Sequence, residues 1–315
     1  MRDLRIVFMG TPEFAVKSLD TIIANGFNVV GVITAPDRPA GRGRKLNLSA
    51  VKTYALSKGL TVLQPTNLKN ENFIAQLKEL KANLQVVVAF RMLPKIVWQM
   101  PEFGTFNLHA SLLPNYRGAA PINWAIINGE TKTGVSTFFI DDKIDTGEMI
   151  LQKEVEISKN ETAGELHDKL MIIGSHLVVD TLNLIKKENV ATTPQAETNN
   201  VKTAYKLDKD NCFINWNNSV HHIHNQVRGL NPYPAAWCLL QNGAEKLNIK
   251  VYKVEAIKCE HNYDIGKLVT SKDDIKVATK NGLISLKEIK LPGKRKMDTK
   301  SLLNGFKFLA DAKML

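Results

Sequence analysis

Two polar side chains, Asn107 and His109, alternate with apolar ones at the start of the segment FNLHASLLP, residues 106–114 of this 315-residue chain. Residues two apart on a β-strand project from the same face, so the amide and the imidazole would lie side by side. A carboxylate, Asp145, follows the next apolar strand in a loop that ends with glycine. Amides donate hydrogen bonds, and imidazole and carboxylate groups exchange protons, which suits acid-base chemistry on a small ligand. Each residue alone is also typical of a hydrogen-bonded strand position or a turn.

Short Val/Ile-rich strands alternate with helices of about ten residues over the first part of the chain. This pattern predicts a mostly parallel sheet with helices on both faces, a doubly wound, Rossmann-like α/β fold. Ligands bind such sheets at the carboxyl ends of the strands, where residues 107, 109 and 145 would lie. The strands are expected at residues 4–9, 28–34, 60–63, 84–90, 105–109, 134–140 and 149–157, and the helices at 14–24, 50–58, 72–81, 94–99, 121–128 and 162–187.

A polar stretch that contains a proline, NVATTPQAETNNV from residue 189, ends this alternation and indicates a linker. We therefore expect one domain over residues 1–188, a linker over 189–205 and a second domain over 206–315. After a helix at 219–229, the second domain has short strands at 247–257, 266–270, 275–279 and 283–289 between Asn, Asp and Gly turns. This arrangement is typical of a small OB-like β-barrel, a fold that often binds oligonucleotides.

The positive charge of the chain is concentrated in its last third. Lys and Arg number 42 and Asp and Glu 31, and residues 206–315 alone hold 19 basic and 11 acidic side chains, a net charge of +8. The excess favours a polyanionic partner, with a solvated lysine-rich surface as the alternative. Three widely spaced cysteines form no disulfide framework, which indicates a reducing, cytoplasmic setting. No apolar stretch approaches the roughly 20 residues that cross a bilayer, so no membrane association is expected.

Several longer motifs resemble those of the folate-dependent formyltransferases, in order and over nearly the whole chain. They are VFMGTPEFAV at 7–16, APDRPAGRGRKL at 35–46, VVVAF at 86–90, SLLPNYRGAAPI at 111–122 and NPYPAAW at 231–237. Within that family, the match is similar to the members that formylate methionine on initiator tRNA. The resemblance implies 10-formyltetrahydrofolate as co-substrate, no metal, and Asn107, His109 and Asp145 as catalytic residues. The amide and imidazole would then donate to the oxyanion of a tetrahedral intermediate, and Asp145 would orient His109 or relay a proton.

The resemblance also implies which segments bind the two substrates. The folate pocket is expected at Phe90, Arg91, Met92, Leu93, Ser111, Leu112, Leu113, Pro114, Ile140 and Asp142. The tRNA is expected to contact Arg38, Arg42, Arg44 and Lys45, in a loop over residues 36–46, and Lys294, Arg295 and Lys296 in the second domain. Phe90, Arg91 and Met92 stand where many relatives read AYG, so the contacts of the folate pocket are expected to differ there.

Two other functions fit parts of the sequence. Folate-dependent formyl transfer to a ribonucleotide, a sugar amine or water would use the same three residues, but it would not need the basic loop or the basic second domain. A non-catalytic RNA-binding protein would keep the basic regions, but an intact set of Asn107, His109 and Asp145 disfavours it. We expect a monomeric, cytoplasmic enzyme of translation initiation.

Overall fold

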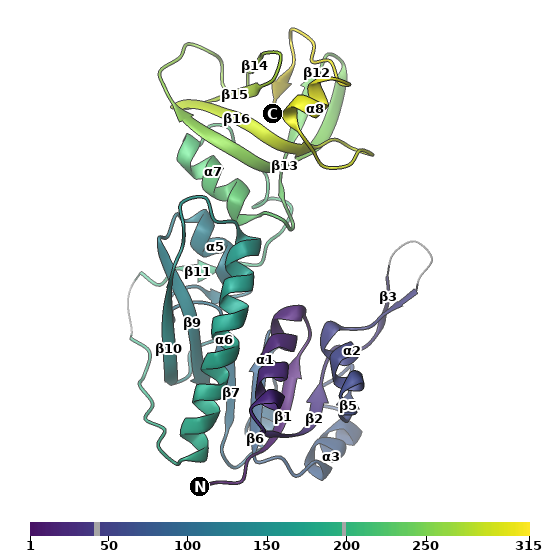
Figure 1. The fold of residues 1–315 in the computed structure, drawn as a ribbon, viewed down its shortest axis with the longest axis vertical. Helices are drawn as coiled ribbons and strands as arrows, with labels where there is room; N and C mark the ends of the chain where they lie inside the picture. The colour runs from purple at the N-terminus through teal and green to yellow at the C-terminus, as the bar shows by residue number, and fades with distance from the viewer. Residues whose placement is uncertain (41–44, 197–199) are drawn as a thin grey trace. The chain divides into compact units, whose positions relative to one another are not determined.

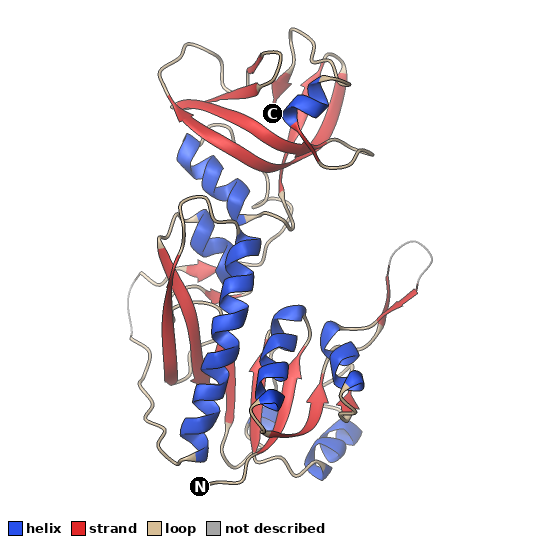
Figure 2. Ribbon diagram, in the orientation of Figure 1, coloured by secondary structure: helices blue, strands red, loops and turns tan. Residues whose placement is uncertain are grey.

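The computed structural model describes residues 1–40, 45–196 and 200–315, and the chain forms two compact units (Figures 1 and 2). The first consists of Met1–Gly118, Thr133–Val155 and His167–Thr203. The second consists of Ala119–Lys132, Glu156–Leu166 and Ala204–Leu315. Segments that are distant in the sequence therefore complete each unit.

A seven-stranded sheet forms the centre of the first unit, in the order β10-β9-β7-β6-β1-β2-β5. Neighbouring strands from β5 to β7 run parallel, and β9 runs antiparallel to β7. This confirms the predicted doubly wound, mostly parallel sheet. The strands are β1 (Arg5–Gly10), β2 (Asn28–Ile33), β5 (Val62–Leu63), β6 (Leu84–Val88), β7 (Thr105–His109), β9 (Lys132–Phe139) and β10 (Met149–Glu156).

Helices cover both faces of this sheet. On one face, Val7 and Met9 of β1 pack in a buried cluster with residues of α3 and α4, among them Phe73. On the other face, α6 approaches β7 so closely that a Cβ on Gly174 would lie 2.9 Å from the Leu108 side chain. Every residue of β6 is buried, as expected for a central parallel strand. The helices are α1 (Glu13–Ala24), α2 (Ala50–Ser57), α3 (Glu71–Glu79), α4 (Lys95–Trp98) and α6 (Ala163–Lys186).

The strand order reverses beside β1. The chain runs from β1 to β2 and β5 on one side, and then returns to β6 on the other side. In open α/β sheets, ligands bind at the carboxyl ends of the strands near such a reversal. Gly10 ends β1 there, and a Cβ on it would lie 2.6 Å from the Cβ of Ala15 and 3.0 Å from the carbonyl oxygen of Val88. Only glycine fits this close approach of β1, α1 and β6.

The basic segment that was predicted to be a loop contains two short antiparallel strands, β3 (Arg38–Ala40) and β4 (Lys45–Asn47). Figure 1 shows β3 extending outward from the end of the unit near α2. At its base, the Asp37 carboxylate accepts hydrogen bonds from Lys52 and from Gln64. These two bonds attach the base of the hairpin to α2 and to the segment after β5.

An antiparallel sheet, in the order β14-β15-β16-β13-β12-β18, forms the second unit. The Met314 amide donates to the Gly266 carbonyl at 2.9 Å, which links β18 to the start of β14 and nearly closes the sheet. Ile223 and Val227 of α7 pack in its core with Ile249 and Leu286. The predicted OB-like barrel is confirmed. The elements of the second unit are α5 (Pro121–Ile127), α7 (Val220–Gly229), β12 (Ala236–Asn242), β13 (Glu245–Lys258), β14 (Leu268–Thr270), β15 (Ile275–Thr279), β16 (Gly282–Lys290), β17 (Met297–Asp298), α8 (Thr299–Leu303) and β18 (Lys313–Met314). The short strands β8 (Arg117–Gly118) and β11 (Thr203–Ala204) pair with each other in a separate two-stranded sheet.

Candidate active site

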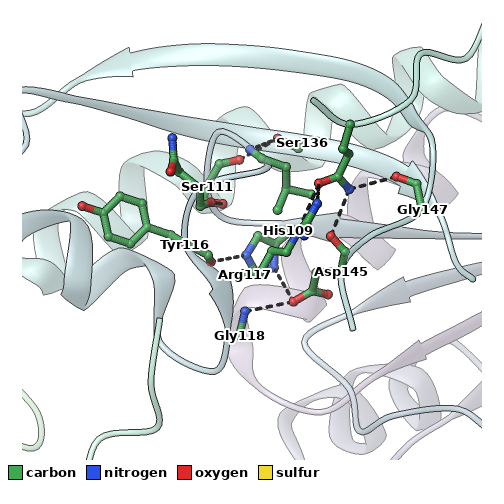
Figure 3. A network of polar contacts seen from close by, with 11 residues as sticks. His109, Ser111, Tyr116, Arg117, Gly118, Ser136, Asp145 and Gly147 are labelled. Atoms are coloured by element: carbon green, nitrogen blue, oxygen red, sulfur yellow. Dashed lines mark hydrogen bonds and ion pairs between the residues drawn. The ribbon is translucent and has the colours of Figure 1, made fainter. Parts of the chain in front are cut away.

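The end of β7 carries Asn107 and His109 on one face of the strand, as their spacing predicts. The intervening Leu108 and the preceding Phe106 are buried in the core, with exposed fractions of 3% and 0%. The loop after β9 brings Asp145 to the same place, and its Oδ2 atom lies 3.8 Å from Nδ1 of His109 (Figure 3). Both side chains are largely shielded from solvent. The structure therefore brings the predicted imidazole and carboxylate together.

Both ring nitrogens of His109 face a protein oxygen. Nε2 lies 2.8 Å from the Tyr116 carbonyl oxygen, and because a carbonyl only accepts, Nε2 carries the hydrogen in this arrangement. Nδ1 faces Asp145 at a distance longer than a direct hydrogen bond. A polar group of a substrate, or a water molecule, could bridge Nδ1 and the carboxylate at this separation.

Two further residues fix the position of Asp145. The backbone N–H of Gly118 donates to Oδ2 of Asp145 at 3.0 Å. The Gln195 side chain donates to the carbonyl oxygens of Asp145 and Gly147, both at 2.9 Å, and accepts from the Arg117 guanidinium at 2.6 Å. The backbone of Asp145 is left-handed, with φ of 55°, a conformation that Asp adopts more readily than most residues. Asp145 is thus held in place by hydrogen bonds to its side chain and to its backbone.

The Asn107 side chain is half-buried and forms no hydrogen bond with the described residues. Its amide therefore has a free N–H donor beside the His109 and Asp145 pair. A free amide donor next to an acid-base pair suits the stabilisation of an oxyanion while a proton is transferred.

Strands β9 and β10 hold the SLLP segment. Ser136 donates to the carbonyl oxygen of Ser111 at 2.6 Å, and Gln152 donates to that of Leu113 at 3.1 Å. The Leu112 side chain packs against Gly134, where a Cβ would lie 2.5 Å from it. Of the four predicted residues, Ser111 and Leu113 are buried, and Leu112 and Pro114 are half-buried.

The other residues predicted to bind folate also converge. Phe90, Leu93 and Ile140 contact the same buried cluster beneath the sheet end. The Nζ atom of Lys95 lies 3.6 Å from the carboxylate of Asp142, which links the start of α4 to the loop after β9. Met92 remains exposed, at 67% of its surface. The structure therefore places the segments 90–93 and 140–142 next to each other.

Arg91 has a supporting role in this arrangement. Its guanidinium donates to the carbonyl oxygens of Pro65 and Thr66 and lies 5.6 Å from the centre of the Phe90 ring. Desolvation, and then the positive charge of Arg38, lower the pKa of Arg91. The side chain thus ties the segment after β6 to the segment after β5.

The residues predicted to contact tRNA occupy two separate regions. Arg38 is exposed at the base of the hairpin, Lys45 begins β4, and Arg42 and Arg44 lie outside the described residues. In the second unit, Lys294 and Arg295 are exposed in the turn after β16. Lys296 is 2.8 Å from the carboxylate of Glu288 and 5.4 Å from the centre of the Tyr252 ring.

Sequence reasoning did not identify three residues that build the site, namely Tyr116, Gly118 and Gln195. Two of them contribute backbone groups, which no side-chain pattern indicates. Gln195 lies in the stretch interpreted as a linker, 50 residues after the loop that it supports.

In the described part of the chain, no group of three or more His, Cys, Asp or Glu side chains is arranged to hold a metal ion. No described helix has both the length and the apolar character needed to span a membrane.

Comparison with known proteins gives a consistent result. A family model described as formyl transferase matches residues 4–182, and one described as formyl transferase, C-terminal domain, matches residues 206–307. The chain is 63% identical to the methionyl-tRNA formyltransferase of Flavobacterium johnsoniae over 314 residues, 100% of both chains. It is 51% identical to the methionyl-tRNA formyltransferase of Parabacteroides distasonis over 98% of each chain.

Solved structures with a similar fold are more distant in sequence. WlaRD, a sugar 3N-formyl transferase crystallised with dTDP and 5-N-formyl-THF, matches with a TM-score of 0.64 at 20% identity, over 94% of this chain and 100% of its own. HypX from Aquifex aeolicus in complex with tetrahydrofolic acid matches with a TM-score of 0.62 at 14% identity, over 96% of this chain and 47% of its own. At these identities the likeness concerns the fold.

Proposed function

The chain belongs to the formyl transferase family, and we propose that Asn107, His109 and Asp145 carry out its reaction. That reaction transfers the formyl group of 10-formyltetrahydrofolate to the α-amino group of methionyl initiator tRNA, for translation initiation. The observation that supports these residues most is the His109 and Asp145 pair, 3.8 Å apart, at the end of the strand that also carries Asn107.

In the first step, the methionine amine attacks the formyl carbon and a C–N bond forms. Negative charge then develops on the formyl oxygen, and a donor that is already in place stabilises it. The free Asn107 amide suits this role, since Nε2 of His109 is engaged with the Tyr116 carbonyl. Loss of one such donor typically costs about 3 to 4 kcal/mol, a 100- to 1000-fold decrease in kcat.

The reaction also requires that the amine nitrogen lose a proton and that N10 of the folate gain one as its bond to the formyl carbon breaks. Nδ1 of His109 and the Asp145 carboxylate lie 3.8 Å apart at this strand end, and both groups can exchange protons. We assign proton transfer to that pair. An α-amino group with a pKa near 8 is partly neutral at pH 7, so strong activation of the nucleophile is unnecessary.

The two substrates would bind to different parts of the chain. Residues 90–93, 111–114, 140 and 142 would form the folate pocket in a catalytic domain at 1–188. The Arg-rich hairpin and the basic turn at 294–296 would contact tRNA, the latter from a tRNA-binding domain at 206–315 that follows a linker at 189–205. Lysine and arginine side chains bind RNA largely through its phosphates. We further propose that the enzyme acts as a monomer in the cytoplasm, where its tRNA substrate is used.

The decisive assay incubates the purified protein with methionyl initiator tRNA and 10-formyltetrahydrofolate and measures formylmethionine. The expected result is formylation of the tRNA and no formylation of a free sugar amine; the reverse preference would overturn the proposal. Asn107→Ala should lower kcat by about 100- to 1000-fold, while the KM values for both substrates stay close to wild type. An Asn107→Ala variant with unchanged kcat would exclude the oxyanion role.

A further inference from the structure

The lysines of the barrel differ in how their charge is balanced. On β15, β16 and α8, the ammonium groups of Lys276, Lys287 and Lys300 lie 3.6, 3.1 and 3.6 Å from carboxylates. Within the described residues, Lys250 and Lys290 have no such carboxylate partner. The barrel therefore has an unbalanced positive charge where β13 and β16 carry these two lysines.

The register of the strands places the two lysines opposite each other. Lys250 on β13 pairs with Lys290 on β16 on one side and with Trp237 on β12 on the other. The adjacent pair, Val251 and Ile289, is fully buried, so the row of Trp237, Lys250 and Lys290 faces outward. Like charges directly opposite each other on paired strands destabilise a sheet. An anion bound across both ammonium groups would remove that cost.

The loop that contacts this row carries an exposed aromatic side chain. Tyr233 follows α7 and is 81% exposed. The loop that carries it is attached to β13 on both sides of the ring: Asn231 donates to the Tyr252 carbonyl at 2.8 Å, and Lys250 donates to the Pro234 carbonyl at 2.9 Å. The loop that carries Tyr233 is therefore held against β13 beside Lys250, and the Tyr233 side chain remains largely exposed to solvent.

We propose that Tyr233, Lys250 and Lys290, here called the barrel patch, bind the substrate tRNA, with the lysine pair holding backbone phosphates and the tyrosine ring stacking on an unpaired base. This inference rests on the proposed function, because it takes tRNA as the substrate. Basic side chains beside an open aromatic ring are the combination that binds unpaired nucleotides. The nearby carboxylate of Glu288 is engaged by Lys296 and does not neutralise the patch.

Two matched double variants test the lysines. Lys250→Gln with Lys290→Gln removes the unbalanced pair, and Lys276→Gln with Lys287→Gln removes two lysines that already have carboxylate partners. Affinity for methionyl initiator tRNA is measured at several salt concentrations. For the first variant, the slope of log affinity against log salt should become shallower by about 1.4 to 1.8, because each lost phosphate contact changes it by about 0.7 to 0.9. The control should retain the wild-type slope. Equal changes in both variants would overturn the lysine assignment.

Two substitutions of Tyr233 test the stacking. Tyr233→Ala should weaken tRNA binding by about five- to 150-fold, as expected for one stacked base, whereas Tyr233→Phe keeps the ring and should bind like the wild type. Equal binding by wild type, Tyr233→Ala and Tyr233→Phe would refute the stacking.

In all variants, kcat at saturating tRNA and the KM for folate should be unchanged. A wild-type protein that does not formylate tRNA would contradict the proposed function, whereas an active protein whose patch variants bind normally would contradict only the patch.

Discussion

Gln195 is expected to control catalysis without touching a substrate, because it positions the loop that carries Asp145. Its side-chain amide donates to the carbonyl oxygens of Asp145 and Gly147, each at 2.9 Å. Gln195→Met keeps the size of the side chain and removes both bonds. Each is worth about 1 kcal/mol net, so the loop should lose about 2 kcal/mol of preference for its present position. At about 1.4 kcal/mol per factor of ten, kcat should fall roughly 30-fold.

Steady-state kinetics with saturating folate and tRNA measure this effect, and the KM values should change little because the loop and not the substrate pockets is perturbed. Gln195→Glu should also lower kcat, since a carboxylate keeps the contact with Arg117 but opposes the two carbonyl oxygens. Gln226→Met is the matched control, because Gln226 also donates to two backbone carbonyls but belongs to the second unit. It should lower the melting temperature and leave kcat unchanged. A Gln195→Met enzyme with kcat within twofold of wild type would refute the reasoning.

Three further outcomes are expected. Arg91→Met should raise the KM for 10-formyltetrahydrofolate by roughly five- to tenfold with little change in kcat, because it removes the hydrogen bonds to the carbonyl oxygens of Pro65 and Thr66. An unchanged KM would show that these hydrogen bonds do not support the folate pocket. Gly147→Ala should abolish most activity and lower the melting temperature, because the added Cβ would lie 1.7 Å from the Phe139 carbonyl oxygen, whereas Gly305→Ala has open space and should be neutral. Burial, and then the charge of Arg228, lower the pKa of His224 from 6.5, so the unfolded chain binds a proton more readily than the folded one. The free energy of unfolding should therefore be level above about pH 7 and fall as the pH drops below 6.5; thermal melts of His224→Gln should show a smaller fall, and an identical fall would contradict the assignment.

The periodicity of apolar residues was sufficient to predict both folds and to place Asn107 and His109 on one face of a strand. Each element is specified by the alternation of its own residues, so β7 was predicted with the bounds that it has, Thr105–His109. β12 was not predicted, because Ala236–Asn242 begins within a proline-rich motif and its apolar run alone does not distinguish a strand from a loop. The hairpin of β3 and β4 was likewise missed, since Gly and Pro in its sequence are typical of an irregular loop.

The chain's own pattern thus accounts for which residues share a strand, which faces are buried and where the basic residues are concentrated. The contacts that support the active site, and the strand pairing that forms the barrel patch, are decided only by the tertiary structure. Gln195 reaches Asp145 across 50 residues, and Lys250 meets Lys290 only through the register of two paired strands. Local sequence specifies the direction of a side chain within its element, whereas the distance between two elements results from packing of the whole core, which no short window of sequence encodes.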